Sequence, residues 1–302
     1  MSSARTRLPT DLPDAVGEYF APELSTVASY LDRVPAALDD GDPTVGPVHP
    51  VPWLYVADLT GWRGLALARL LAARRDCPCY GLSALAADAV ETLWAAVDRS
   101  ADGPVVVHLE LRGDAGPIPA ALREALRRGY ERPAGPDADA VAGDPTNVVV
   151  VFTDTDPSKR LDSPLPDATT PVSGAALSYA PRDSMTPEQP AGTTTLPAPP
   201  ALGDRTDELA AVLSAALDGT GSESDREQYV DSAVEALATT HAAVGRRDLL
   251  FDVSPRVALA HGHRLPAVGL DDALAGLRRD LLARVPESPG SEELRATLAD
   301  LL

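Results

Sequence analysis

Apolar residues near the N-terminus recur at helical spacing. Over residues 14–38 they fall three or four positions apart, with Pro22 and Pro35 interrupting the series. The spacing predicts one or two amphipathic helices. A loop rich in Asp, Gly and Pro follows at 39–50, and the apolar run 51–57 then predicts a buried strand.

Strands and helices alternate over the next hundred residues. The strand at 51–57 leads into a turn with two glycines at 58–64 and a helix rich in Leu, Ala and Arg at 65–75. The same patterns predict helices at 84–99 and 119–130 and strands at 104–111 and 147–153. Since strands joined by helices lie parallel, we expect an α/β fold with a mainly parallel sheet flanked by helices.

Prolines crowd residues 161–205, which predicts a linker or extended arm. Helices are expected beyond it, at 207–217, 225–244, 270–285 and 291–302. We therefore predict three regions: an α/β core with N-terminal helices at 1–160, the proline-rich linker at 161–205, and a small helical, lid-like domain at 206–302.

Composition adds a strong acidic bias. The 302 residues include 45 acidic and 26 basic ones, for a net charge of -19, and Lys159 is the only lysine. Arginine is less strongly hydrated than lysine, and a carboxylate-rich surface retains water and cations in molar salt, so the composition indicates a halophilic, archaeal protein. The long apolar runs favour a packed fold over a disordered acidic chain.

The charge and the hydrophobic pattern disfavour nucleic-acid binding and membrane insertion. The negative charge repels phosphates and no basic stripe is evident, so nucleic-acid binding is not expected. No run of eighteen apolar residues occurs, and no charged segment followed by an apolar stretch begins the chain. We expect a cytoplasmic protein without membrane insertion.

The turn at 58–64 is the first place where chemistry could reside. Ligands of open parallel sheets bind beyond the carboxyl ends of the strands, and Gly61 and Gly64 would let backbone N–H groups approach an anion at the next helix. However, Arg63 stands where a phosphate-binding loop has its lysine, and Asp58 brings a negative charge to the loop. A nucleotide cradle using Arg63 is one interpretation; the favoured one is a tight turn in which Trp62 packs on a neighbour.

Acidic residues also follow the other predicted strands. Glu110 and Asp114 do not reproduce the acidic pair that binds magnesium after such a strand. Asp154, Asp156 and Ser158 have a spacing similar to the cation site of von Willebrand A domains, but Asp residues after strands commonly cap turns. We therefore assign no metal site here.

Cysteine and histidine offer no clear site. Cys77 and Cys79 are too close for an ordinary structural disulfide and too few for zinc, so we expect two reduced thiols. His261 and His263 lack a third ligand, which favours surface or packing roles. With no nucleophile elbow and no dinucleotide fingerprint, we assign no catalytic residue.

The order of these features resembles that of MoxR-type AAA+ ATPases. Residues 53–71 occupy the place of the Walker A strand, loop and helix, and 117–129 resemble the proline-started helix after Walker B. Residues 148–157 resemble the sensor-one strand, with Asp156 in place of its asparagine. Pro-Leu-Pro-Asp-Ala at 164–168 is similar to a family stretch, although the Asp-Arg-Phe that should follow is missing.

The resemblance extends to the C-terminal region. Val-Ser-Pro-Arg at 253–256 is similar to the Ser-Pro-Arg of the family's helical lid, which implies that Arg256 is its sensor-two arginine. The resemblance implies lost phosphoryl transfer, since the Walker lysine, Walker B acids, sensor asparagine and arginine finger are all altered.

We therefore expect a catalytically inactive, AAA+-like scaffold, adaptor or regulatory subunit that needs no cofactor. Its partner would be another protein, such as an active AAA+ ATPase or a von Willebrand A protein. The alternatives are an active MoxR-like ATPase with divergent motifs, and a metal enzyme using Asp154, Asp156 and Glu110. A further alternative is a module that senses ATP or ADP with Mg²⁺ without hydrolysis, the phosphates lying among Gly61, Arg63, Gly64 and Arg256.

Overall fold

A computed structural model describes most of the chain, namely residues 7–32, 53–83, 88–111, 120, 122, 147–155, 174–179, 193–245, 253–285 and 291–302. Its contacts divide the chain into two compact units. The α/β unit comprises Met1–Leu12 and Pro22–Pro199, and the helical unit comprises Pro13–Ala21 and Pro200–Leu302. The domain boundaries that we predicted at 160 and 205 differ from this division and stay a prediction.

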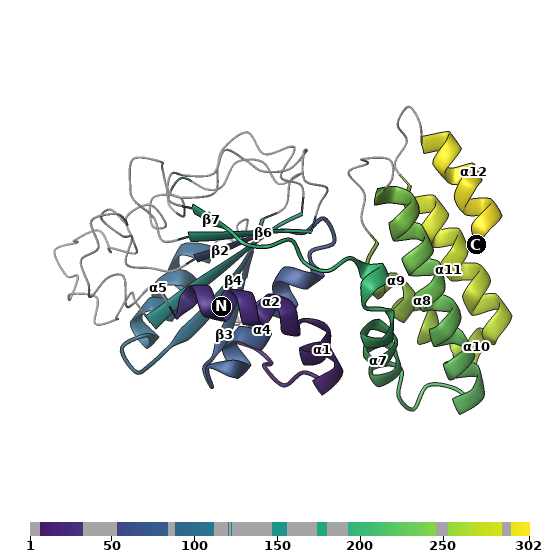
Figure 1. Ribbon diagram of the computed structural model, residues 1–302. Helices are drawn as coiled ribbons and strands as arrows, with labels where there is room; N and C mark the ends of the chain where they lie inside the picture. The colour runs from purple at the N-terminus through teal and green to yellow at the C-terminus, as the bar shows by residue number, and fades with distance from the viewer. Residues whose placement is uncertain are drawn as a thin grey trace. The chain divides into compact units, whose positions relative to one another are not determined.

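One twisted sheet forms the centre of the α/β unit (Figure 1). Its order within the described residues is β1-β3-β4-β5-β2-β6-β7, and every neighbouring pair is parallel except β1 and β3. The strands are β1 (Arg7–Leu8), β2 (Trp53–Ala57), β3 (Cys79–Ser83), β4 (Val105–Leu111), β5 (Val148–Asp154), β6 (Gly174–Ser178) and β7 (Thr193–Thr195).

The central strands are buried on both faces, which explains their nearly continuous apolar sequence. On one face, helix α5 (Ala89–Arg99) packs Leu93 and Trp94 into a cluster with Trp53 and Phe152, whose rings meet edge to face with centroids 6.4 Å apart. Alternate β5 residues point to the other face, where helix α4 (Trp62–Arg74) contacts β3, β4 and β5. Helix α2 (Ala21–Leu31) completes the described helices of this unit.

The predicted α/β fold class, with a helical C-terminal region, is confirmed. The strands predicted at 51–57, 104–111 and 147–153 appear as β2, β4 and β5, and the helices at 65–75 and 84–99 appear as α4 and α5. The helix predicted at 119–130 lies outside the described residues except for Ala120 and Leu122.

Four strands of the sheet, β1, β3, β6 and β7, were not predicted, and β1 has only two residues. Strand β3 lies between two predicted helices, and its Cys-Tyr-Gly-Leu-Ser sequence has no β-branched residue to mark it. Strands β6 and β7 lie within 161–205, which we interpreted as a linker or arm, yet both are parallel members of the sheet. The prolines around these short strands obscured them.

The helical unit is built around a long central helix, α8 (Glu223–Gly245), which contacts α7, α9, α11 and α12 (Figure 1). The surrounding helices are α1 (Asp14–Tyr19), α7 (Thr206–Ala216), α9 (Pro255–Gly262), α10 (Leu265–Val268), α11 (Leu270–Arg284) and α12 (Ser291–Leu301), with a short 3-10 turn η4 (Leu202–Asp204). The helices predicted at 207–217, 225–244, 270–285 and 291–302 are therefore present. The short helices α9 and α10 were not predicted.

A buried arginine fastens the first helix to this unit. The Arg205 guanidinium lies over the Tyr19 ring, 4.2 Å from its centroid, and donates to the carbonyl oxygens of Tyr19 at 2.8 Å and Pro200 at 3.1 Å. The contacts with Tyr19 join residues that are 186 positions apart, and α1 packs with α7.

Within the described ranges, no helix is both long and apolar enough to cross a membrane.

Candidate functional site

The parallel strands bring their carboxyl ends to one edge of the sheet. The register pairs Ala57 at the end of β2 with Asp154 of β5 on one side and Ser178 of β6 on the other. The turn from Asp58 to Gly61, which connects β2 to α4, therefore emerges between the ends of β5 and β6. Ligands of open α/β sheets bind at this edge, so this is the candidate functional site.

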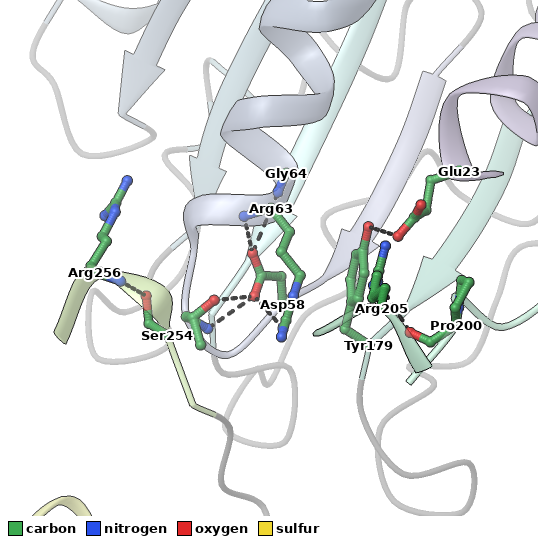
Figure 2. Close-up of polar contacts among 10 residues, drawn as sticks. Glu23, Asp58, Arg63, Gly64, Tyr179, Pro200, Arg205, Ser254 and Arg256 are labelled. Atoms are coloured by element: carbon green, nitrogen blue, oxygen red, sulfur yellow. Dashed lines mark hydrogen bonds and ion pairs between the residues drawn. The ribbon is translucent and has the colours of Figure 1, made fainter. Parts of the chain in front are cut away.

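The Asp58 carboxylate points back into the turn and accepts hydrogen bonds from it (Figure 2). Its Oδ1 accepts from the N–H of Thr60 at 3.0 Å and from the Thr60 hydroxyl at 2.6 Å. Its Oδ2 accepts from the N–H of Arg63 at 2.7 Å and from that of Gly64 at 3.4 Å. The Asp58 carboxylate is fully buried and satisfies the backbone donors with which a helix N-terminus binds an anion.

The two glycines have structural roles in the same turn. Gly61 has a φ of 69°, in the left-handed region, where it precedes the first residue of α4. A Cβ at Gly64 would lie 1.9 Å from the Thr153 hydroxyl oxygen, so only glycine allows α4 to approach β5 this closely. Their presence is therefore explained by the fold, without a bound ligand.

Arg63 turns its side chain into the protein. The side chain is 3% exposed, and its Nη1 lies 3.4 Å from Asp58 Oδ1 in a buried ion pair. Its guanidinium carbon also lies 4.7 Å from the centroid of the Tyr179 ring and 5.7 Å from that of Trp62. Gly61, Arg63 and Gly64 lie in one turn, and the Arg63 guanidinium is held there by Asp58 and aromatic rings; a role of these residues in nucleotide binding stays a prediction.

Residues distant in the sequence support Arg63. The Tyr179 hydroxyl donates to Glu23 Oε1 at 3.3 Å, and Glu23 on α2 is 2% exposed. This contact joins the end of β6 to α2 across 156 positions. The ring beneath the Arg63 guanidinium is therefore fixed by a hydrogen bond of its own, which favours a permanent arrangement of this side chain.

Arg256 lies in the helical unit. It is the second residue of α9, its side chain is exposed, and its backbone N–H donates to Ser254 Oγ at 3.2 Å as part of the helix cap. Its predicted part in a phosphate site with the turn after β2 stays a prediction.

Asp154 has a structural role at the end of β5. Its carboxylate is buried and accepts from the Tyr55 hydroxyl at 2.9 Å, and its carbonyl oxygen accepts from the Asp58 N–H at 3.0 Å. Asp114, Asp156 and Ser158 lie outside the described residues. In the part of the chain that the structure describes, no three His, Cys, Asp or Glu side chains are grouped to hold a metal.

One histidine that we did not single out lies directly behind the turn. His108 on β4 is 5% exposed, and its Nε2 lies 2.9 Å from the Thr153 hydroxyl. Burial lowers its pKa to about 4, although the nearby charges of Glu110 and Asp58 oppose this shift. The imidazole is therefore neutral near pH 7. Its position within an apolar strand, Val-Val-Val-His, was the available signal.

The remaining predicted candidates are packed into the fold. Cys77 and Cys79 are free and buried, and burial raises the pKa of Cys79 to about 12, so this thiol is unreactive. His261 is buried, with its Nε2 2.9 Å from Asp280 Oδ2, whereas His263 is exposed. These positions agree with reduced thiols and with packing or surface roles for the histidines.

Comparison with known proteins gives only distant likenesses. No protein-family model and no curated protein matches the chain. Among solved structures, the HORMA:CdnC:Trip13 complex of E. coli MS115-1 aligns with a TM-score of 0.42 and 14% identity, over 91% of this chain and 94% of that one. The FIGL-1 AAA domain aligns with a TM-score of 0.35 and 12% identity, over 83% and 77%. C. elegans PCH-2 aligns with a TM-score of 0.33 and 12% identity, over 89% and 69%.

Proposed function

We propose that this protein is a catalytically inactive AAA+-like scaffold, adaptor or regulatory subunit of a larger assembly. The observation that supports this proposal is the Asp58 carboxylate, which already accepts hydrogen bonds from the turn's N–H groups. A triphosphate in the same turn would have to displace a buried carboxylate that is also paired with Arg63.

The turn after β2 offers little free positive charge to a phosphate. Phosphoryl transfer depends almost entirely on positioning and on neutralising the phosphate oxygens. In this turn the Asp58 carboxylate is negatively charged, and the Arg63 guanidinium is already paired with it. Residues 58–64 contain no lysine. Moving Asp58 out would break its buried ion pair with Arg63 and its hydrogen bonds to the N–H groups of the turn, at a cost of about 3 to 5 kcal/mol. ATP binding would have to supply that energy before any catalysis.

We further propose that the protein is a MoxR-type relative in a halophilic archaeon and that it acts in the cytoplasm. It rests on the sequence resemblance and on the acidic, lysine-poor composition. An active AAA+ ATPase or a von Willebrand A protein is the kind of partner that this assignment implies.

Measurement of ATP turnover by the purified protein in about 2 to 3 M KCl, a range suited to a halophilic protein, tests the proposal. We expect no magnesium-dependent hydrolysis above background. Hydrolysis abolished by Arg63→Ala would refute the proposal in favour of an active ATPase with divergent motifs. Binding of ADP or ATP without turnover would instead support a nucleotide sensor.

A further inference from the structure

A second grouping of charged side chains lies in the helical unit, where a pocket of about 320 Å³ opens among α9, α10 and α11. Its lining includes the polar and ionisable side chains of His261, Arg264, Asp272, Arg279 and Asp280, and Val268 adds apolar surface. The pocket therefore combines cations, anions and aliphatic surface in a small volume.

The floor of the pocket is fixed by a histidine and an aspartate. The His261 ring is buried and its Nε2 lies 2.9 Å from Asp280 Oδ2, which joins α9 to α11. A Cβ at Gly276 would lie 2.6 Å from His261 Nδ1, so the glycine makes space for the ring. One oxygen of the Asp280 carboxylate, Oδ2, is thereby engaged with His261, and the side chain is half-exposed.

The two arginines of the pocket differ from the buried arginines of this chain. The guanidinium group of Arg63 pairs with Asp58, and that of Arg205 donates to a backbone carbonyl oxygen, both inside the fold. Arg264 and Arg279 are exposed, and among the described residues neither guanidinium has an ion-pair or hydrogen-bond partner. In a chain with 45 acidic and 26 basic residues, two such guanidinium groups in one pocket are available to an external anion.

We propose that this pocket binds an acidic peptide segment of a protein partner, an inference that rests on the proposed scaffold function. The planar guanidinium groups of Arg264 and Arg279 suit carboxylate side chains. Val268, which is partly exposed, would contact aliphatic carbons of the same segment. Asp272 has no partner among the described residues and would accept a peptide N–H.

The test is a titration of the fluorescein-labelled, amidated peptide Asp-Leu-Glu-Leu-Asp, followed by fluorescence anisotropy at about 0.1 M and about 2 M KCl to expose charge screening. We expect saturable binding to the full-length protein that weakens about tenfold or more in Arg264→Gln/Arg279→Gln. Arg278→Gln is the matched control because Arg278 is an exposed neighbour on α11 outside the pocket lining. It should bind like wild type, and circular dichroism should show all three proteins equally folded.

Three results would overturn the inference: no saturable binding, equal weakening by Arg278→Gln and the double variant, or competition by inorganic phosphate at the concentration at which unlabelled peptide competes. The outcome is separate from that of the turnover assay. Failure of peptide binding together with absent ATP hydrolysis would remove this partner surface and leave the scaffold proposal intact. Observed hydrolysis would remove the scaffold proposal whatever the peptide does.

Discussion

Replacing Asp58 by alanine should destabilise the α/β unit strongly. The change removes the acceptor for the N–H groups of Arg63 and Gly64, both buried, and leaves the 3% exposed Arg63 side chain without its carboxylate. Thr60 is partly exposed, so its donors can return to water. Loss of one partner of a buried ion pair costs about 3 to 5 kcal/mol, and we expect a loss of that size in the free energy of unfolding.

Urea unfolding followed by tryptophan fluorescence measures this loss selectively. All three tryptophans, Trp53, Trp62 and Trp94, lie in the α/β unit, so their emission reports on that unit alone. The control is Asp98→Ala, an exposed aspartate on α5 whose removal should change stability by no more than about 0.5 kcal/mol.

A second substitution distinguishes the loss of the Asp58–Arg63 ion pair from the loss of the other Asp58 hydrogen bonds. Adding Arg63→Met to Asp58→Ala removes the buried charge that has lost its carboxylate, so the double variant should be more stable than the two single losses added together predict. A loss below about 1 kcal/mol in Asp58→Ala, similar to a single exposed contact, would refute the reasoning that this carboxylate holds the turn.

Three further predictions concern other parts of the α/β unit. Gly64→Ala would place a Cβ 1.9 Å from the Thr153 hydroxyl oxygen and should cost about 1 to 3 kcal/mol in the same unfolding assay; unchanged stability would contradict the close approach of α4 to β5. His108 has a folded pKa of about 4 against 6.5 in the unfolded chain, so only the unfolded state gains its proton between these values. Stability should therefore fall by up to about 3 kcal/mol as pH falls from 6.5 to 4, by less in His108→Gln, and equal pH dependence of the two would count against a buried neutral imidazole. Because the pKa of Cys79 is raised to about 12, a thiol reagent at pH 8 should label it only after denaturation, and rapid labelling of the native protein would contradict its burial.

The sequence predicts the sheet where hydrophobic patterning is strong and fails where it is weak. Val148 to Val151 are four consecutive valines, typical of a strand buried on both faces, and β5 appears where expected. Strand β3 consists of Cys, Tyr, Gly, Leu and Ser, and β6 of Gly, Ala, Ala, Leu and Ser, so neither has enough β-branched residues to be distinguished from a loop.

The turn after the first predicted strand is present at 58–61, but the direction of its side chains was not predicted. We expected Asp58 to place a negative charge in the loop, whereas it points inward to the N–H groups of Thr60, Arg63 and Gly64. An aspartate that accepts from the N–H two residues later is a common local turn, so part of this arrangement was available from the sequence. The hydrogen bond from Tyr179 to Glu23, 156 positions away, joins distant parts of the chain and leaves no signal in the sequence.

The central claim is that the anion position of the turn after β2 is already occupied by Asp58. A calorimetric titration of the wild-type protein with ATP and magnesium, and with ADP and magnesium, tests it most directly. We expect no saturable heat with either nucleotide. Stoichiometric binding that Arg63→Ala abolishes would contradict it, because a phosphate would then be displacing the carboxylate that we hold to be fixed there.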